Sequence, residues 1–406
     1  MSSTTPGDGT ARDPRFARRP PRRPLRLSWA DERVRNIVWQ VLVVGLIGYL
    51  FWWLWANTSY NLQVRNIATG FGFLDREAGL PIGESLIAYD PSDTYFRALL
   101  VGVLNTLKVA VVGILLATLL GTAIGIARLS RNWLVARISY WYVEIIRDLP
   151  LLLQLLFWYA LLQGLPGPRQ ALNPIEGVFL SNRGLKLPWF EWESAHASAF
   201  LVLLVGALAT WAYRRVRRAQ QMKDGQPRRV WPVALVAMLG LPLLTWWSLG
   251  APFTPDVPAL GGFNFRGGLD ISPEFFALLL GLTLYTAAFI AEIVRAGILA
   301  VGQGQWEAAR ALGLPNGRMM SLIVLPQAMR VIIPPMTSQF LNITKNSSLA
   351  VAIGYQDIVS IANTTLNQTG QAIEGIAIIM AVYLTISLTI SLFMNWYNAR
   401  LALVER

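Results

Sequence analysis

The chain has 406 residues, of which 54% are hydrophobic and only 14% are charged, so it is more apolar than an ordinary soluble domain and is predicted to lie in a lipid bilayer. It contains no cysteine, which excludes disulfides, thiolate catalysis and zinc–thiolate sites. The formal net charge is +12, but the basic residues cluster beside hydrophobic runs, which is typical of the inner loops of membrane proteins and argues against nucleic-acid binding.

The N-terminal region predicts a basic tail followed by one membrane span. Residues 1–36 are rich in Pro and Arg and are expected to be a disordered cytoplasmic tail. The apolar run at 37–56 is too long for the hydrophobic region of a signal peptide and has no small-residue cleavage site, so we expect a retained span. An acid-leaning outer loop follows, and residues 37–96 therefore form an additional N-terminal unit.

The next two hydrophobic runs carry features that predict how their helices pack. The span at 97–127 contains Gly121 and Gly125, whose missing side chains let two membrane helices approach closely. Its end is followed by arginines, which place that end on the cytoplasmic side. The span at 138–162 contains Pro150, which lacks a backbone N–H, so we expect a break in the helix there.

The remaining hydrophobic runs predict five further spans, at residues 197–213, 230–249, 273–298, 320–343 and 374–397. A strongly basic segment, 214–229, marks the inner side between the first two of these, which are alternatively an interfacial hairpin. Pro334 and Pro335 are expected to interrupt the span at 320–343, and residues 347–373 are expected to form an outer re-entrant or helical segment. The total is about eight spans, with Arg400 and Arg406 keeping the C-terminus inside.

A short polar island separates the spans at 273–298 and 320–343. Its residues Glu307 to Leu312 are good helix formers that end at Gly313, which predicts a two-turn helix with a left-handed stop. Residues 314–317 then turn the chain. The pattern resembles the EAA loop of ABC importer permeases, and it is matched at Glu307, Ala308, Ala309, Gly313, Ile323, Leu325 and Pro326. The resemblance implies a coupling helix near residues 302–317 that seats on a separate ATPase subunit.

Four stretches resemble the polar amino-acid branch of these permeases: 105–108, 142–155, 291–298 and 345–349. The similarity covers about residues 97–163 and 273–400, which implies a permease core in two parts, 97–163 and 273–406, with an insertion at 164–272 that holds two extra spans. The layout is similar to the long permeases of general L-amino-acid or glutamate/glutamine/aspartate/asparagine uptake systems. One departure is Arg147-Asp148-Leu149-Pro150, where the branch more often has Arg-Gly-Thr-Pro.

The resemblance implies an all-α integral membrane protein with the transmembrane fold of a type I ABC importer. The chain would be a non-catalytic permease subunit in the bacterial inner membrane, with both termini cytoplasmic, that moves polar L-amino acids inward. The partners implied are a dimer of ATP-binding subunits, a second, similar permease and a periplasmic amino-acid-binding protein. The chain lacks the Gly-x-x-x-x-Gly-Lys-Ser/Thr phosphate loop, so ATP and Mg²⁺ are expected on the partner; no cofactor or metal is expected on this chain.

Ionisable and polar residues within the spans are the candidates for a substrate pathway. An amino acid presents one ammonium and one carboxylate, so its route needs an anion together with a cation or helix N-terminus a few ångströms away. The candidates are Glu292 for the ammonium, Arg147 with a half-helix starting near Pro150 for the carboxylate, and Lys345, Asn342 and Gln154 in support.

Each charged candidate also has a structural explanation. Arg147 is alternatively paired with Asp148 or Glu144, Glu292 with Arg295, and Lys345 reaches the membrane interface.

Two other functional classes compete with the permease interpretation. A stand-alone secondary transporter or channel would also show broken helices and buried charge, but would work without an ATPase. A membrane-embedded enzyme would need paired catalytic groups, and none stand out. The lone histidine, His196, lies at a span boundary and is interpreted as structural.

Overall fold

The computed structural model describes residues 29, 32–64, 69–224 and 230–401. It divides into two compact parts, residues 1–69 and 70–406, and each is described by itself. The first part holds one helix, α1 (Glu32–Val64), which is longer than the predicted span at 37–56 and exposes apolar side chains along its whole length. Most of the predicted tail, together with Arg228, Arg229 and Arg406, lies outside the described residues.

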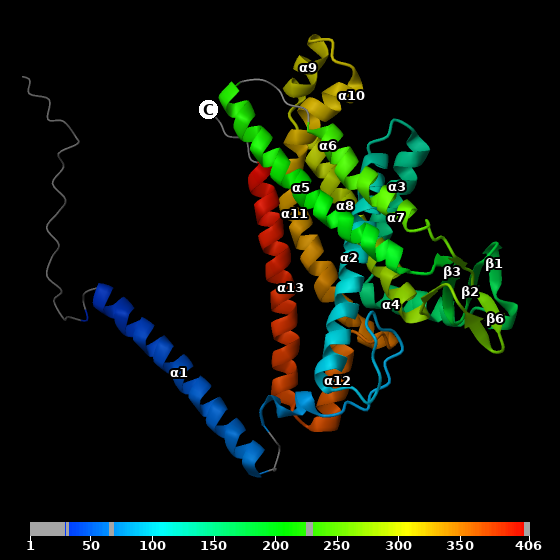
Figure 1. Cartoon of the computed structure of the whole chain (residues 1–406). Coiled ribbons are helices and arrows are strands. Elements are labelled where there is room, and N and C mark those ends of the chain that lie inside the picture. Colours follow the sequence, from blue (N-terminus) through cyan, green and yellow to red (C-terminus); the bar gives the residue numbers. More distant parts are fainter. Residues whose placement is uncertain (1–28, 30–31, 65–68, 225–229, 402–406) are drawn as a thin grey trace, which may run out of the picture. The chain divides into compact units, whose positions relative to one another are not determined.

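The centre of the second part is a pair of long helices, α2 (Tyr95–Ala127) and α8 (Pro273–Leu299), which lie side by side in Figure 1. Each begins at a side-chain cap: Thr94 accepts a hydrogen bond from the N–H of Arg97, and Ser272 accepts one from Phe275. A Cβ added at Gly125 would lie 2.7 Å from the carbonyl oxygen of Ala291, so only glycine allows this approach. The predicted close packing at the glycine pair is therefore confirmed.

The third predicted span is two helices, α3 (Trp133–Asp148) and α4 (Leu151–Gln163), which meet at an angle of 104°. Pro150 stands between them, in an extended conformation, as the N-cap of α4. Asn132 caps the start of α3 by accepting hydrogen bonds from the N–H groups of Leu134 and Val135. The predicted break at Pro150 is confirmed.

The inserted region contains short strands that the sequence interpretation did not anticipate. Four strands form an antiparallel sheet in the order β1-β2-β3-β8: Leu172–Ile175, Val178–Ser181, Gly184–Leu187 and Leu269–Ile271. Two smaller pairs are β4 (Trp189–Phe190) with β5 (Pro255–Asp256), and β6 (Ala259–Gly261) with β7 (Asn264–Arg266). Because β3 pairs with β8, the sheet joins the beginning of the insertion to its end.

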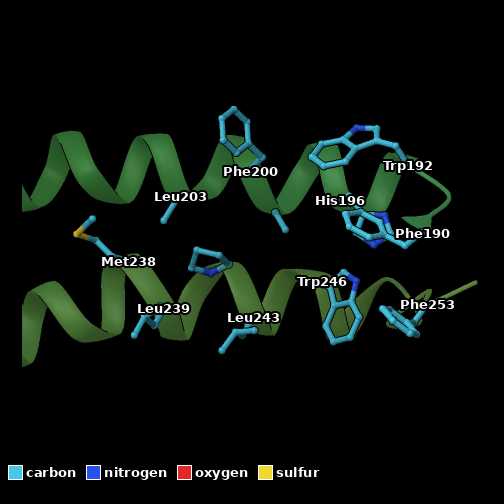
Figure 2. Close-up of a pocket in the computed structure, with 12 residues that line it drawn as sticks. Phe190, Trp192, His196, Phe200, Leu203, Met238, Leu239, Leu243, Trp246 and Phe253 are labelled. Atoms are coloured by element: carbon cyan, nitrogen blue, oxygen red, sulfur yellow. The ribbon is translucent and has the colours of Figure 1, made fainter. Parts of the chain in front are cut away.

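The two extra helical segments of the insertion pack as a hairpin. The first is α5 (Ser194–Asp224); the second is continuous through α6 (Trp231–Leu235), the π-turn η4 (Val236–Gly240) and α7 (Leu241–Ser248). An apolar groove of about 530 Å³ lies between α5 and the segment η4–α7, and Figure 2 shows the aromatic side chains gathered at one end of it. His196 lies among them, and its Nδ1 accepts a hydrogen bond from the N–H of Glu193 at 3.2 Å. These are packing and capping contacts, in agreement with the structural interpretation of this histidine.

The C-terminal half contains the loop helices and the last two long helices. The elements are α9 (Gln303–Ala311), α10 (Asn316–Met319), the π-turn η5 (Met320–Val324), α11 (Leu325–Asn346), the 3₁₀-helix η6 (Ser347–Ile353), α12 (Ile358–Thr369) and α13 (Ala372–Leu401). Two further 3₁₀-helices, η2 (Phe71–Asp75) and η3 (Pro168–Gln170), lie earlier in the chain. For residues 347–373 the sequence left a re-entrant or a helical segment open, and the structure shows helices there, η6 and α12.

The expected interruption at Pro334 and Pro335 is wrong, because α11 continues through both residues as one helix. The two prolines remove only the N–H donors that would pair with the carbonyls of residues 330 and 331, and the helix continues past both positions. Ile332 and Ile333 are buried, so packing on neighbouring helices also holds the segment in place.

Seven of the described helical segments are long and apolar enough to cross a membrane, and the count is eight when the bent pair α3 and α4 is taken as one span. The prediction of about eight membrane helices is thereby confirmed.

Candidate functional site

The loop between α8 and α11 ends its first helix with a complete Schellman motif. Gly313 has a φ of +68°, and its N–H donates to the carbonyl of Arg310 at 2.9 Å. The N–H of Leu314 donates to the carbonyl of Ala309 at 3.2 Å. These are the two hydrogen bonds that close a helix whose stop is a left-handed residue. The predicted left-handed stop is confirmed, and Figure 1 shows α9 and α10 beyond the ends of α8 and α11.

The predicted coupling residues of α9 divide into a buried face and an exposed face. Ala309 is fully buried and packs in a cluster with Val301 and Met319. Glu307 and Ala308 are exposed. Leu312, one residue before the stop, is also exposed, at 76%. The helix is thus anchored on one side and unpartnered on the other.

The second half of the matched pattern connects α9 to α11. Ile323 packs against the same buried cluster as Ala309, whereas Leu325 and Pro326 are exposed in the first turn of α11. The amide of Gln327 donates to the side-chain oxygen of Gln305 at 3.3 Å, which adds a direct hydrogen bond from α11 to α9. A force applied to α9 therefore has a packed and hydrogen-bonded route into a long apolar helix.

Glu292 belongs to a charged cluster that joins α2, α3 and α8. The guanidinium of Arg295 donates to both carboxylate oxygens of Glu292, at 2.6 and 3.0 Å. Arg128, whose side chain is only 8% exposed, donates to the same carboxylate at 2.5 Å and lies 3.7 Å from Glu144. The structural pair of Glu292 with Arg295 is therefore present, and an ammonium group would have to displace an arginine to reach this carboxylate. Its substrate role stays a prediction.

Arg147 is exposed in the last turn of α3, beside the break at Pro150. Its guanidinium lies 5.1 Å from the centre of the Phe289 ring on α8. Among the described residues no ion pair joins it to Glu144 or to Asp148, so neither alternative pairing is formed. Its positive charge also acts on the Glu292 carboxylate of α8, so the predicted cation and the predicted anion lie in the same region.

Gln154 closes the bend between α3 and α4. Its side-chain N–H groups donate to the carbonyls of Ile146 and Leu149, both at 3.0 Å. Those carbonyls lie at the end of α3, where helical partners are missing. Its side-chain oxygen is buried without a hydrogen-bond partner. The sequence interpretation placed Gln154 in the substrate pathway and missed this structural role.

Asn342 and Lys345 are exposed near the end of α11, but they lie at a different level from Glu292. Ile343, the residue after Asn342, lies 3.8 Å from where a Cβ on Gly113 of α2 would be. Ala291, the residue before Glu292, packs instead against Gly125 of the same helix. These two glycines are roughly 18 Å apart at 1.5 Å per residue. The structure therefore separates Asn342 and Lys345 from Glu292, whereas Arg147 lies over Phe289, three residues before Glu292 on α8, and its charge acts on that carboxylate.

A second charged group, which the sequence interpretation missed, lies where the segment before α2 folds back on the helix bundle. Glu84 forms an ion pair with Lys108 of α2 and accepts a hydrogen bond from the hydroxyl of Ser272 at 2.7 Å. The side-chain amide of Asn105 donates to the backbone carbonyl of Glu84 at 2.9 Å. The sequence signal that could have predicted this group is Lys108, because a lysine within an apolar span needs a partner for its charge.

Comparison with known proteins agrees with this geometry. The model of the family described as "Binding-protein-dependent transport system inner membrane component" matches residues 113–403, which include the whole α9 loop. The permease protein YhdX of Escherichia coli strain K12 is 54% identical over 94% of this chain and 97% of its own length. The general L-amino acid transport system permease protein AapQ of Rhizobium johnstonii is 49% identical over 94% and 96%.

A third relative is the glutamate/glutamine/aspartate/asparagine transport system permease protein BztB of Rhodobacter capsulatus, which is 42% identical over 95% of this chain and 99% of its own length. Each of these three alignments covers at least 94% of this chain, so each extends over the inserted region as well as the core. The chain therefore belongs to the family of binding-protein-dependent transport system inner membrane components, has the transmembrane fold of type I ABC importers, and is one of the long amino-acid ABC transporter permeases.

Proposed function

We propose that this chain is the permease subunit of an ATP-driven importer that moves polar L-amino acids from the periplasm to the cytoplasm. The observation that carries the proposal is the α9 helix, which is fixed by Ala309 and the Gly313 stop and leaves Glu307, Ala308 and Leu312 exposed. An anchored helix with an unpartnered face is what a separate ATPase subunit needs in order to push on the membrane helices. The names of the relatives AapQ and BztB support general L-amino acids, and acidic amino acids with their amides, as the substrate class.

The assembly that we propose contains a dimer of ATP-binding subunits, a second and similar permease, and a periplasmic amino-acid-binding protein. The chain itself lies in the inner membrane with both termini and the α9 loop in the cytoplasm. The arginines that follow α2 and those in the last turns of α5 support this orientation, because basic residues concentrate at the inner ends of spans.

We also propose where the substrate passes. Arg147 is exposed, its guanidinium lies over the Phe289 ring without an ion pair among the described residues, and it adjoins the N-terminus of α4, where Pro150 provides no side-chain cap. The free N–H groups of that first turn and the guanidinium together suit a carboxylate. Asn342 and Lys345 are exposed on α11 and supply further polar contacts, while Glu292 becomes an ammonium contact only if Arg128 or Arg295 moves away.

Uptake into proteoliposomes tests the proposed function. The chain is purified with its native associates, reconstituted, and given radiolabelled L-glutamate with the binding protein, with and without ATP inside the vesicles. We expect uptake that requires ATP and the ATP-binding subunits. Uptake by the chain alone that is driven by an ion gradient would instead identify a secondary transporter.

A further inference from the structure

A positively charged cavity of about 470 Å³ opens between the start of α3 and the adjoining ends of α2 and α8. Its lining residues are Arg128, Trp133, Ala136, Arg137, Tyr140 and Arg295. None of these six residues is acidic, and the two carboxylates of the neighbouring cluster, Glu144 and Glu292, are not among them. The cavity lies at the same end of the bundle as α9, because the last turns of α2 pack against the last turns of α8.

The three arginines of the cavity differ in whether a carboxylate already pairs with them. Arg128 and Arg295 are engaged by Glu292. Arg137 is exposed, and its guanidinium lies 5.5 Å from the ring centre of Tyr140 and 5.2 Å from that of Trp141; among the described residues it has no ion pair. Arg128 lies on the same Tyr140 ring at 5.3 Å. A guanidinium that lies beside two aromatic rings, with its N–H fork unused among the described residues, is well suited to a phosphate.

A stripe of exposed apolar side chains runs along α3 next to the cavity. The cavity is lined by residues 133, 136, 137 and 140, which share one face of the helix. The neighbouring face carries Leu134, Ile138, Trp141 and Ile145, which are between 50 and 62% exposed. These four side chains extend for roughly 16 Å along α3, away from the charged end and toward the middle of the apolar region. A charged cavity that continues into an apolar stripe matches a headgroup followed by an acyl chain.

We propose that this cavity binds the phosphate of an anionic phospholipid in the leaflet on the α9 side, with an acyl chain lying along the Leu134–Ile145 stripe. Basic pockets at the ends of membrane helices bind such headgroups, and Trp133, at the mouth of the cavity, has the usual position of an interfacial tryptophan. A free phosphate ion would use the arginines but leave the stripe uncovered. The proposal requires only that the chain lies in a membrane, and not that it transports a particular substrate.

Native mass spectrometry of the assembled transporter tests the proposal. The complex is purified in detergent and titrated with phosphatidylglycerol or with phosphatidylcholine, and the bound lipid is counted. We expect phosphatidylglycerol to bind more tightly than phosphatidylcholine. In R137Q the apparent affinity for phosphatidylglycerol should fall about tenfold, the loss expected when a charge-assisted hydrogen bond is removed. The matched control is R131Q, which removes the same charge from an exposed arginine outside the cavity and should change the affinity less than twofold.

Four outcomes would overturn the proposal. Equal losses in R137Q and R131Q would show that the general surface charge attracts the lipid. Equal binding of both lipids would show that the headgroup is not recognised. Displacement of the lipid by millimolar inorganic phosphate would identify a site for the free ion. Binding to the isolated chain but not to the assembled transporter would show that another subunit covers the cavity.

Discussion

Gly313 gives the most direct genetic test of the α9 geometry. Its φ of +68° is a left-handed conformation, which costs a residue with a side chain about 1–2 kcal/mol. A Cβ at this position would have no atom within 4 Å, so the cost comes from the backbone alone and not from a clash. One to two kcal/mol corresponds to roughly a 5- to 30-fold loss of the correctly ended helix in Gly313→Ala. Gly313→Val costs more because its side chain is branched at Cβ, and we expect it to abolish transport.

The assay is ATP-dependent amino-acid uptake in proteoliposomes, with membrane insertion measured in parallel. We expect the order of activity to be wild type, Gly313→Asn, Gly313→Ala, Gly313→Val, because asparagine tolerates the left-handed region best among residues with side chains. Gly317→Val is the matched control, since Gly317 lies in α10, outside the α9 face, without a positive φ and with open space around it. Normal uptake by Gly313→Val, or the same loss in Gly317→Val, would refute the reasoning.

Three further substitutions test the packing and the polar contacts. Gly121→Ala would place a Cβ 2.7 Å from a side chain of α8 and should destabilise the protein by about 1–3 kcal/mol, seen as a lower thermal unfolding temperature in detergent, whereas Gly113→Ala, with its nearest atom at 3.8 Å, should not. Gln154→Leu leaves two carbonyls unpaired and should also cost about 1–3 kcal/mol; unchanged unfolding with a raised KM would instead make this residue a substrate contact. Glu84→Gln breaks the pair with Lys108 and should cost about 1.5–3 kcal/mol, with partial recovery of the unfolding temperature when the lysine is also replaced by Met; no loss in the single variant would show that the pair contributes nothing.

The features that could be predicted from the sequence are those fixed by local chemistry. Gly313 stops a helix because only glycine enters the left-handed region without strain. Pro150 breaks the third span because it cannot donate a helical hydrogen bond. The pair Gly121 and Gly125 indicated that another helix packs closely there, and that helix is α8.

The features that could not be predicted depend on contacts between distant parts of the chain. Glu292 is engaged by Arg128, which is 164 positions away, so a search for neighbours in the sequence found only Arg295. Pro334 stays within a helix because the buried neighbours Ile332 and Ile333 hold the segment in place by packing, despite the N–H that proline lacks. In the insertion, β3 pairs with β8, which lies more than 80 residues later in the chain. Each of these strands is too short to show a clear alternation of apolar and polar residues in the sequence.

The central claim is that the exposed face of α9 docks on an ATP-hydrolysing subunit. Because the chain has no cysteine, Glu307→Cys introduces a single thiol that can be cross-linked without other substitutions. We predict that this thiol cross-links to the ATP-binding subunit in the intact transporter and reacts with impermeant reagents only from the cytoplasmic side. Labelling from the periplasmic side, or ATP-dependent uptake without any contact between this position and the ATPase, would contradict the account.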